Sequence, residues 1–147
     1  MFDTIVVGVD GSDHSYKAVE YAVDIASLAG STLLLLTAFR PIRMPDSSHS
    51  MVRPQLHPDP ADTRMFESAQ EVVEAAAGWA RKRGAPKVET YVRHGPPART
   101  LVSFAHEKNA SAIVVGSRGL GDVTGFLLGS VSQKIAHMAD CTCIIVK

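Results

Sequence analysis

Glycine and serine residues gather in two short stretches of the chain, residues 8–12 and residues 116–132. The first stretch reads Gly-Val-Asp-Gly-Ser, and the second contains five glycines within its first fourteen residues. Glycine lacks a Cβ, so it lets the backbone come close to a ligand. The second stretch ends in Ser130-Val131-Ser132, where we expect a helix to begin with free N–H groups that attract an anion. This pattern indicates a phosphate-binding site, and its alternative is a glycine-rich connection with an ordinary serine cap.

Four apolar runs predict the strands that must position these residues, at 4–9, 32–38, 112–115 and 143–146. None of them alternates between apolar and polar residues, which is typical of strands covered on both faces in a parallel sheet. A fifth run, 87–92, does alternate. It therefore predicts a strand at the edge of the sheet.

Helical patterns separate these apolar runs. The predicted helices extend from residue 12 or 13 to about 29 and from about 61 to 83, and two more open at Pro97 and near Ser130. Tyr21 is expected on the buried face of the first helix, because it recurs with its apolar neighbours at helical spacing.

Five strands alternating with four helices indicate an α/β fold, a three-layer doubly wound parallel sheet with helices on both faces. Right-handed crossovers lead to the strand order 3-2-1-4-5. We expect one domain over residues 1–147, with a long loop at about 40–62 that is either a lid or simply mobile. In this strand order ligands bind outside the carboxyl ends of strands one and four. Residues 8–12 and 116–119 fall at those two ends.

The overall composition excludes several classes of protein. Fifteen basic and fifteen acidic residues cancel, so no basic field attracts nucleic acid or an anionic membrane. No apolar run approaches the ~20 residues that cross a bilayer. Cys141 and Cys143 are the only cysteines, which suits a reducing compartment, and we interpret them as small core residues. We therefore expect a soluble, cytoplasmic protein that binds neither nucleic acid nor membrane.

The spacing of the second stretch resembles a known signature. Gly116 and Gly119 are separated by two residues, and nine residues then precede Gly129 and Ser130. This resembles the G-2x-G-9x-G-[S/T] motif of the ATP-binding branch of the universal stress protein family. The resemblance extends over the whole chain, from the VGVDGS sequence at the first strand to the apolar last strand. It implies an adenine nucleotide alpha hydrolase-like fold.

The same resemblance implies binding roles for individual residues. Gly8, Val9 and Asp10 should line the nucleoside, with Asp10 near the ribose or a Mg²⁺ ion. The backbone of Ala38 should hydrogen-bond to adenine, and Val115 and Gly116 should flank the ribose and the α-phosphate. The residues that should hold the phosphates are Gly119, Gly129, Ser130, Val131 and Ser132. From the residues alone, Asp10 also fits a turn-forming or helix-capping residue, and Ser132 a plain first-turn serine.

Other polar side chains are weaker candidates. Arg118 reaches phosphates in one interpretation and is a solvated loop arginine in the other. His94 follows the third strand, away from the expected site, and His14, His106 and His137 are interpreted as surface positions. No convincing general base accompanies the phosphate-binding groups.

The resemblance implies a nucleotide-responsive regulatory domain for stress resistance that binds ATP, ADP or AMP with Mg²⁺. A slow ATPase or autophosphorylating enzyme is a second interpretation, because Mg²⁺ and positioned phosphates alone produce some rate. A ligand-free dimeric interaction module is the third.

The apolar run 143–146 lies at a sheet edge, and Lys147 is the only charged residue beside it that would oppose pairing with another strand. This predicts a homodimer through antiparallel pairing of this strand with its copy.

Overall fold

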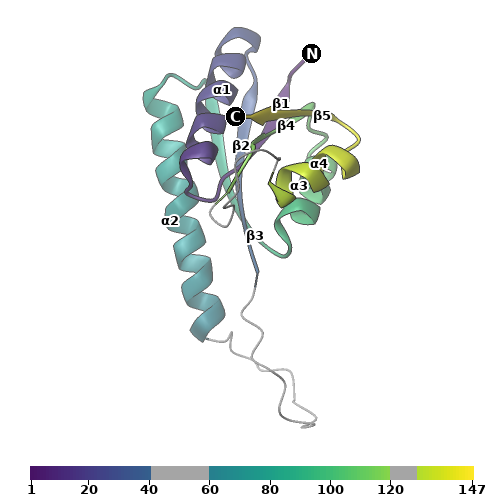
Figure 1. The fold of residues 1–147 in the computed structure, drawn as a ribbon. Helices are drawn as coiled ribbons and strands as arrows, with labels where there is room; N and C mark the ends of the chain where they lie inside the picture. Colours follow the sequence, from purple (N-terminus) through teal and green to yellow (C-terminus); the bar gives the residue numbers. More distant parts are fainter. Residues whose placement is uncertain (41–59, 120–128) are drawn as a thin grey trace.

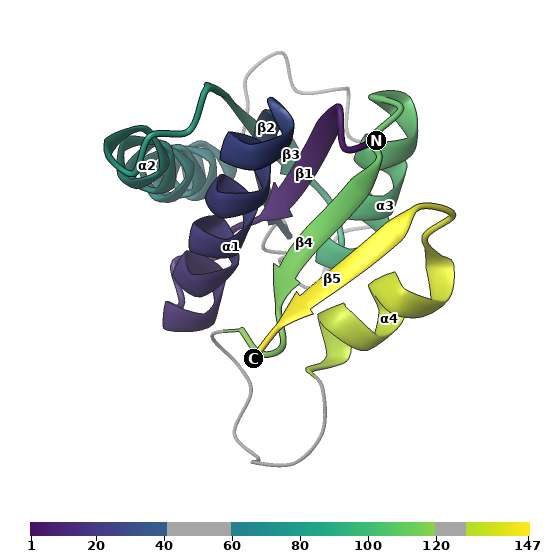
Figure 2. The same cartoon turned by 90° about the horizontal axis from the view of Figure 1, so that it is seen from above.

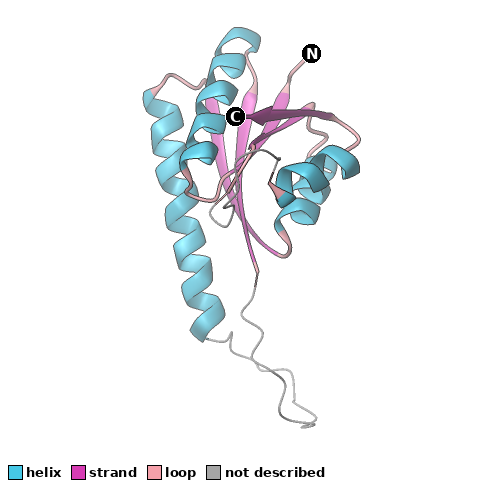
Figure 3. Ribbon diagram, viewed as in Figure 1, coloured by secondary structure: helices cyan, strands magenta, loops and turns pink. Residues whose placement is uncertain are grey.

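Parallel strands and helices alternate along the chain (Figures 1 and 3). The computed structural model describes residues 1–40, 60–119 and 129–147. The elements within these residues are β1 Thr4–Gly8, α1 Asp13–Ala29, β2 Thr32–Phe39, α2 Pro60–Lys82, β3 Lys87–His94, α3 Pro97–Glu107, β4 Ala112–Gly116, α4 Ser130–Met138 and β5 Thr142–Val146. No helix in these ranges combines the length and the apolar character needed to cross a membrane.

All neighbouring strands run parallel, in the order β3-β2-β1-β4-β5. This order and the three-layer arrangement confirm the prediction from the sequence. β1 is the central strand, with Gly8 in register with Leu36 of β2 and Val7 in register with Val114 of β4. Figure 2 shows α1 and α2 on one face of the sheet, α3 and α4 on the other, and β5 at one edge.

The unbroken apolar strands serve two separate cores. Ile5 and Val7 of β1 join the core beneath α1 and α2, whereas Val6 between them joins the core beneath α3 and α4. β2 divides in the same way, since Leu35 belongs to the first core and Leu34 to the second. Successive side chains of a strand point to opposite faces. A strand covered on both faces therefore needs apolar residues at every position.

One expectation about these elements is wrong, and one helix start agrees with its prediction to within a residue. Tyr21 is 53% exposed, because the buried stripe of α1 follows Ala22 and Ala26 and leaves Tyr21 outside it. The helix expected from about residue 61, after the loop expected at about 40–62, begins at Pro60. Proline suits a first helical turn, where its missing N–H would have no partner. The rest of that expected loop, residues 41–59, lies outside the described residues, as do residues 120–128.

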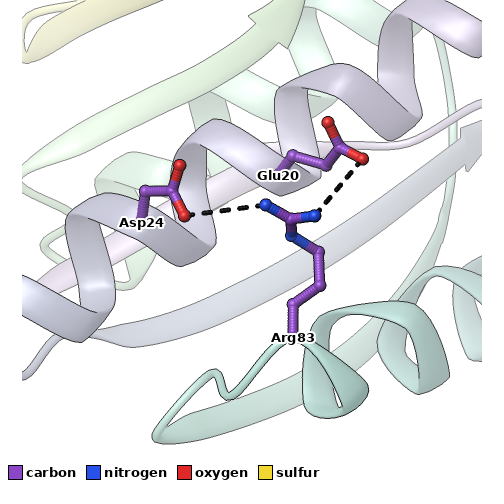
Figure 4. A network of polar contacts seen from close by, with 3 residues as sticks. All are labelled: Glu20, Asp24 and Arg83. Carbon is purple, nitrogen blue, oxygen red and sulfur yellow. Dashed lines mark ion pairs between the residues drawn. The ribbon is translucent and has the colours of Figure 1, made fainter.

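An ion-pair network joins the end of α2 to α1 (Figure 4). The guanidinium of Arg83 lies 3.7 Å from Glu20 Oε1 and 3.8 Å from Asp24 Oδ1. Tyr16 of α1 also meets Trp79 of α2 edge-on, with 6.5 Å between ring centroids. Because the charges are solvent-exposed, they contribute little net stability. The aromatic pair adds an apolar contact between the two helices on this face of the sheet.

Candidate functional site

A cavity of about 380 Å³ lies at the carboxyl ends of β1 and β4, where a ligand is expected in this strand order. All the site residues predicted from the sequence line it. They are Gly8, Val9, Asp10, Ala38, Val115, Gly116, Gly119, Gly129, Ser130, Val131 and Ser132. The fold thus brings segments that are far apart in the sequence together around one cavity. Their contact with a ligand stays a prediction.

Part of the cavity wall is apolar. Leu36 and Ala38 come from β2, Val115 from β4, and Pro97 and Leu101 from α3. An apolar wall of this kind suits a flat, uncharged ring system. Sequence reasoning missed Leu36, Pro97 and Leu101 as site residues. A signal was present for Pro97. It begins α3 directly after β3, the neighbour of β2, so it had to lie at the carboxyl ends of the strands, where the cavity is.

Asp10 organises the turn after β1. Its Oδ1 accepts hydrogen bonds from the Ser12 N–H at 2.9 Å and from the Ser12 hydroxyl at 2.5 Å. Its Oδ2 faces the segment after β4, so a Cβ added to Gly119 would lie only 2.5 Å from this oxygen. Asp10 therefore has the turn-forming role that the sequence also suggested, and its carboxylate still lines the cavity.

Gly116 lies against the backbone of α1. A Cβ at this position would be 2.8 Å from the backbone carbonyl and the Cβ of His14. No side chain fits such a distance, so glycine permits the first turn of α1 to approach the end of β4. The motif glycine at this position therefore has a packing reason in addition to any approach to a ligand.

The first turn of α4 forms a polar part of the wall. Gly129 is its N-cap, with an extended backbone and no side-chain capping bond, and no acidic residue follows in the first turn. The first bond back into the helix comes from the Gln133 N–H to the Gly129 carbonyl, at 3.1 Å. The N–H groups of residues 130–132 precede it, at the positive end of the helix dipole. Such a helix end is suited to an anion like phosphate.

Of the basic and histidine side chains considered from the sequence, Arg118 lines the cavity, whereas His14 and His94 do not. Arg118 is half-buried and lines the cavity. His14 is half-buried too, with Nδ1 at 3.4 Å from the Ser117 hydroxyl, so its expected surface position is wrong. The close approach of α1 to β4 is the reason. His94 is exposed and packs its ring on Phe39 with 5.3 Å between centroids, away from the residues that line the cavity.

The two cysteines belong to the packing of the sheet edge. Cys141 and Cys143 are partly buried against the core beneath α3 and α4. Burial raises the pKa of both thiols, and the neighbouring Cys143 and Asp140 raise the pKa of Cys141 further. The reactive thiolate form is therefore disfavoured. These thiols act as small packing residues.

Metal binding by the protein alone has little support in the described ranges, where no three His, Cys, Asp or Glu side chains gather around one point. Asp10 contributes a carboxylate to the cavity wall. Mg²⁺ is usually bound through one or two carboxylates together with water and phosphate oxygens. One carboxylate in the same cavity wall as a helix end suited to an anion fits a Mg²⁺ ion that would be held jointly with phosphates.

Comparison with known proteins agrees with this architecture. The sequence matches the universal stress protein family over residues 1–147. It is 33% identical to universal stress protein YxiE of Bacillus subtilis and 35% identical to a universal stress protein of Thermus aquaticus, with 100% of both chains covered in each case. A crystal structure of a universal stress protein in complex with cAMP is similar with a TM-score of 0.74 and 30% identity, covering 99% of this chain and 96% of that one. The chain belongs to the universal stress protein family.

Proposed function

We propose that this protein binds an adenine nucleotide in the cavity at the carboxyl ends of β1 and β4 and acts as a nucleotide-responsive regulatory domain in stress resistance. One observation carries the proposal: a single cavity wall combines apolar residues from β2 and α3 with glycine-rich turns and the uncapped start of α4. A nucleotide has the same two parts, an apolar base and charged phosphates. Binding sites of this kind pair an apolar lining with a few placed polar groups.

Each part of the wall has a role in this proposal. Leu36, Pro97 and Leu101 would bury the base, and the backbone of Ala38 would hydrogen-bond to its edge. The N–H groups at the start of α4 and the guanidinium of Arg118 would bind the phosphates. Charge-assisted hydrogen bonds contribute about 1.5–3 kcal/mol each before the cost of ordering the ligand. A few of them with base burial would produce micromolar affinity, about −8 kcal/mol.

A relative supports an adenine nucleotide as the ligand. The universal stress protein crystallised with cAMP shares 30% of its residues with this chain along nearly its whole length. We propose ATP, ADP or AMP for the present protein, with Mg²⁺ when two or more phosphates are bound. Asp10 would then lie near the ribose or the Mg²⁺ ion, as a carboxylate that lines the cavity.

We propose regulated binding rather than efficient turnover. A catalyst needs a base within reach of the attacking group. The acidic side chain in the described cavity wall is Asp10, and its Oδ1 already accepts two hydrogen bonds from Ser12. An assay of ADP formation with Mg²⁺ separates this proposal from the slow ATPase that the sequence also allowed.

The proposal includes a homodimer formed through β5. This strand lies at the sheet edge beside β4, and Cys143, Ile144 and Ile145 are only partly buried. Soluble proteins cover or block an apolar edge strand, and antiparallel pairing with a second copy about a twofold axis closes the contact. Light scattering is expected to yield twice the chain mass of 15.7 kDa. A stable monomer at high concentration with ATP present would refute the dimer.

Isothermal titration calorimetry tests nucleotide binding directly. The unaltered protein is titrated with ATP, ADP, AMP, cAMP, GTP and adenosine, with and without Mg²⁺. Gly129→Val should abolish ATP binding, because a branched side chain then stands at the N-cap of α4 among the residues that line the cavity.

Gly78→Val is the matched control, since a Cβ at Gly78 meets nothing within 4 Å and this residue lies on α2. It should bind ATP like the unaltered protein. If Gly129→Val binds ATP normally, the phosphates are placed wrongly. If the unaltered protein binds no adenine nucleotide, the proposed function is refuted.

A further inference from the structure

Two segments that flank the cavity are joined by hydrogen bonds to one carbonyl group. The Ser117 carbonyl, directly after β4, accepts a bond from the Gly129 N–H at 2.6 Å. It also accepts a bond from the Ser132 hydroxyl at 3.2 Å. The same hydroxyl lies 2.9 Å from the Gly129 carbonyl. Ser132 thus connects the end of β4 to the N-cap of α4.

These contacts are shielded from water. Ser132 is 2% exposed and Ser117 is 5% exposed. A serine in the first turn of a helix commonly bonds to the carbonyl three residues earlier, which accounts for the contact to Gly129. The contact to Ser117 is different, because fifteen residues separate the two serines. A plain first-turn serine has no such long-range bond.

The bonds also decide what the hydroxyl of Ser132 can offer a ligand. A serine hydroxyl has one hydrogen to donate, and here that hydrogen faces the carbonyls of Ser117 and Gly129. The hydroxyl oxygen retains only acceptor capacity, which phosphate oxygens do not need. Ser130 is different, since its side chain is exposed at the start of α4. Of the two serines, Ser130 is the one with a hydroxyl available to phosphate.

The carbonyl of Ser117 is itself held in place. The N–H of Ser117 donates to the Val146 carbonyl at 2.7 Å, which ties this residue to the end of β5. Its side chain lies 3.4 Å from His14 of α1. Ser132 therefore attaches the start of α4 to a point fixed by two other elements. A rigid attachment lowers the cost of ordering the helix end when an anion binds.

We propose that Ser132 is a positioning residue of the nucleotide site. Its hydroxyl holds the first turn of α4 against Ser117, so that the backbone N–H groups of residues 130–132 point at the phosphates, and it does not touch the ligand. This inference rests on the proposed nucleotide-binding function and assigns to the Ser132 hydroxyl a positioning role instead of a phosphate contact.

Calorimetry with three variants tests this role. Ser132→Ala should weaken ATP binding about tenfold, a loss of roughly 1.4 kcal/mol. Adenosine binding should stay unchanged, because the proposal places the base against Leu36, Pro97 and Leu101 of β2 and α3. Ser132→Thr should restore ATP binding, since its hydroxyl reaches the same carbonyls. Ser132→Cys keeps the size but has a weaker donor, so it should fall between the two and serves if the alanine variant does not fold.

Amide hydrogen exchange in the nucleotide-free protein provides a second readout. The Gly129 N–H should exchange faster in Ser132→Ala than in the unaltered protein or in Ser132→Thr. The inference is overturned if Ser132→Ala binds ATP normally, or if it loses ATP and adenosine affinity equally. If the unaltered protein binds no ATP, the proposed function fails instead, and Gly129 exchange alone then decides whether Ser132 holds this helix end.

Discussion

The helices α1 and α4 begin at the same edge of the sheet, each after one of the two adjacent strands β1 and β4, but their first turns differ. In α1, the side chain of Ser12 caps the helix by accepting a bond from the Ser15 N–H, and Asp13 places a negative charge in the first turn. In α4, the N-cap is Gly129, without a side-chain bond and without an acidic residue in the first turn. The first helix end is satisfied by its own residues, whereas we propose that the second binds an external anion.

A shift of one residue produces this difference. Both helices begin at a Gly-Ser pair, Gly11-Ser12 and Gly129-Ser130. In the first pair the serine is the N-cap, where its oxygen reaches back to an N–H group. In the second pair the glycine is the N-cap and the serine is the first helical residue. The same pair of residues therefore provides a side-chain cap at the start of α1 and no side-chain cap at the start of α4.

The largest expected effect comes from making α4 resemble α1. Ser130→Asp places a carboxylate in the first turn of α4, where it repels phosphates and competes for the N–H groups. ATP affinity should fall roughly 100-fold or more, about 2.7 kcal/mol. The melting temperature without nucleotide should stay the same or rise, because a negative charge favours a helix N-terminus. Calorimetry and thermal unfolding measure the two quantities, with Ser130→Asn as the uncharged control. If Ser130→Asp binds ATP with normal affinity, the start of α4 does not bind the phosphates.

A smaller effect is expected at Asp10, which belongs to the turn before α1 and also lines the cavity. Asp10→Ala should weaken ATP binding about tenfold, or 1.4 kcal/mol. Asp10→Asn keeps an oxygen for the Ser12 N–H but loses the charge, so it should lose mainly the part of the affinity that depends on Mg²⁺. Titrations with and without Mg²⁺ resolve these contributions. Native affinity in both variants would leave Asp10 with its turn-forming role alone.

The smallest effect compares the two serines directly. Ser12→Ala removes the cap of α1 and should lower the free energy of unfolding by about 1 kcal/mol. Ser130→Ala should cost less than about 0.5 kcal/mol of stability, because its side chain caps nothing, yet it should weaken ATP binding. Urea unfolding and calorimetry on both variants test this contrast. Equal losses of stability would show that the two helix ends do not differ as described.

The fold could be predicted from the sequence because its strongest signals are local. The apolar runs have no alternation, and this alone indicates strands between two layers of helices. The order of the strands then follows from the handedness of the connections. The edge position of β3 was visible in the alternation of residues 87–92. Tyr21 was misplaced because the boundary of a buried helical stripe depends on what packs against it.

The candidate site was predictable where it depends on backbone and spacing, as at Gly116, Gly119 and Gly129. It was not predictable where side chains from other elements complete it. Leu101 lines the cavity because α3 packs beside β1 and β4 in space, and nothing local to Leu101 indicates this. The direction of the Ser132 hydroxyl is likewise set by a carbonyl fifteen residues away.

The central position of β1 has a consequence for the order in which the molecule assembles. β1 and β2 are close in the chain, whereas the partner of β1 on its other side, β4, begins only at Ala112. Pairings between distant segments form late, since a long loop must first close. The cavity lies where this late pairing of β1 with β4 ends, with residues from β1 and α1 on one side and from β4 and α4 on the other. A ligand bound there contacts both halves, so its binding energy opposes their separation and favours the completed sheet.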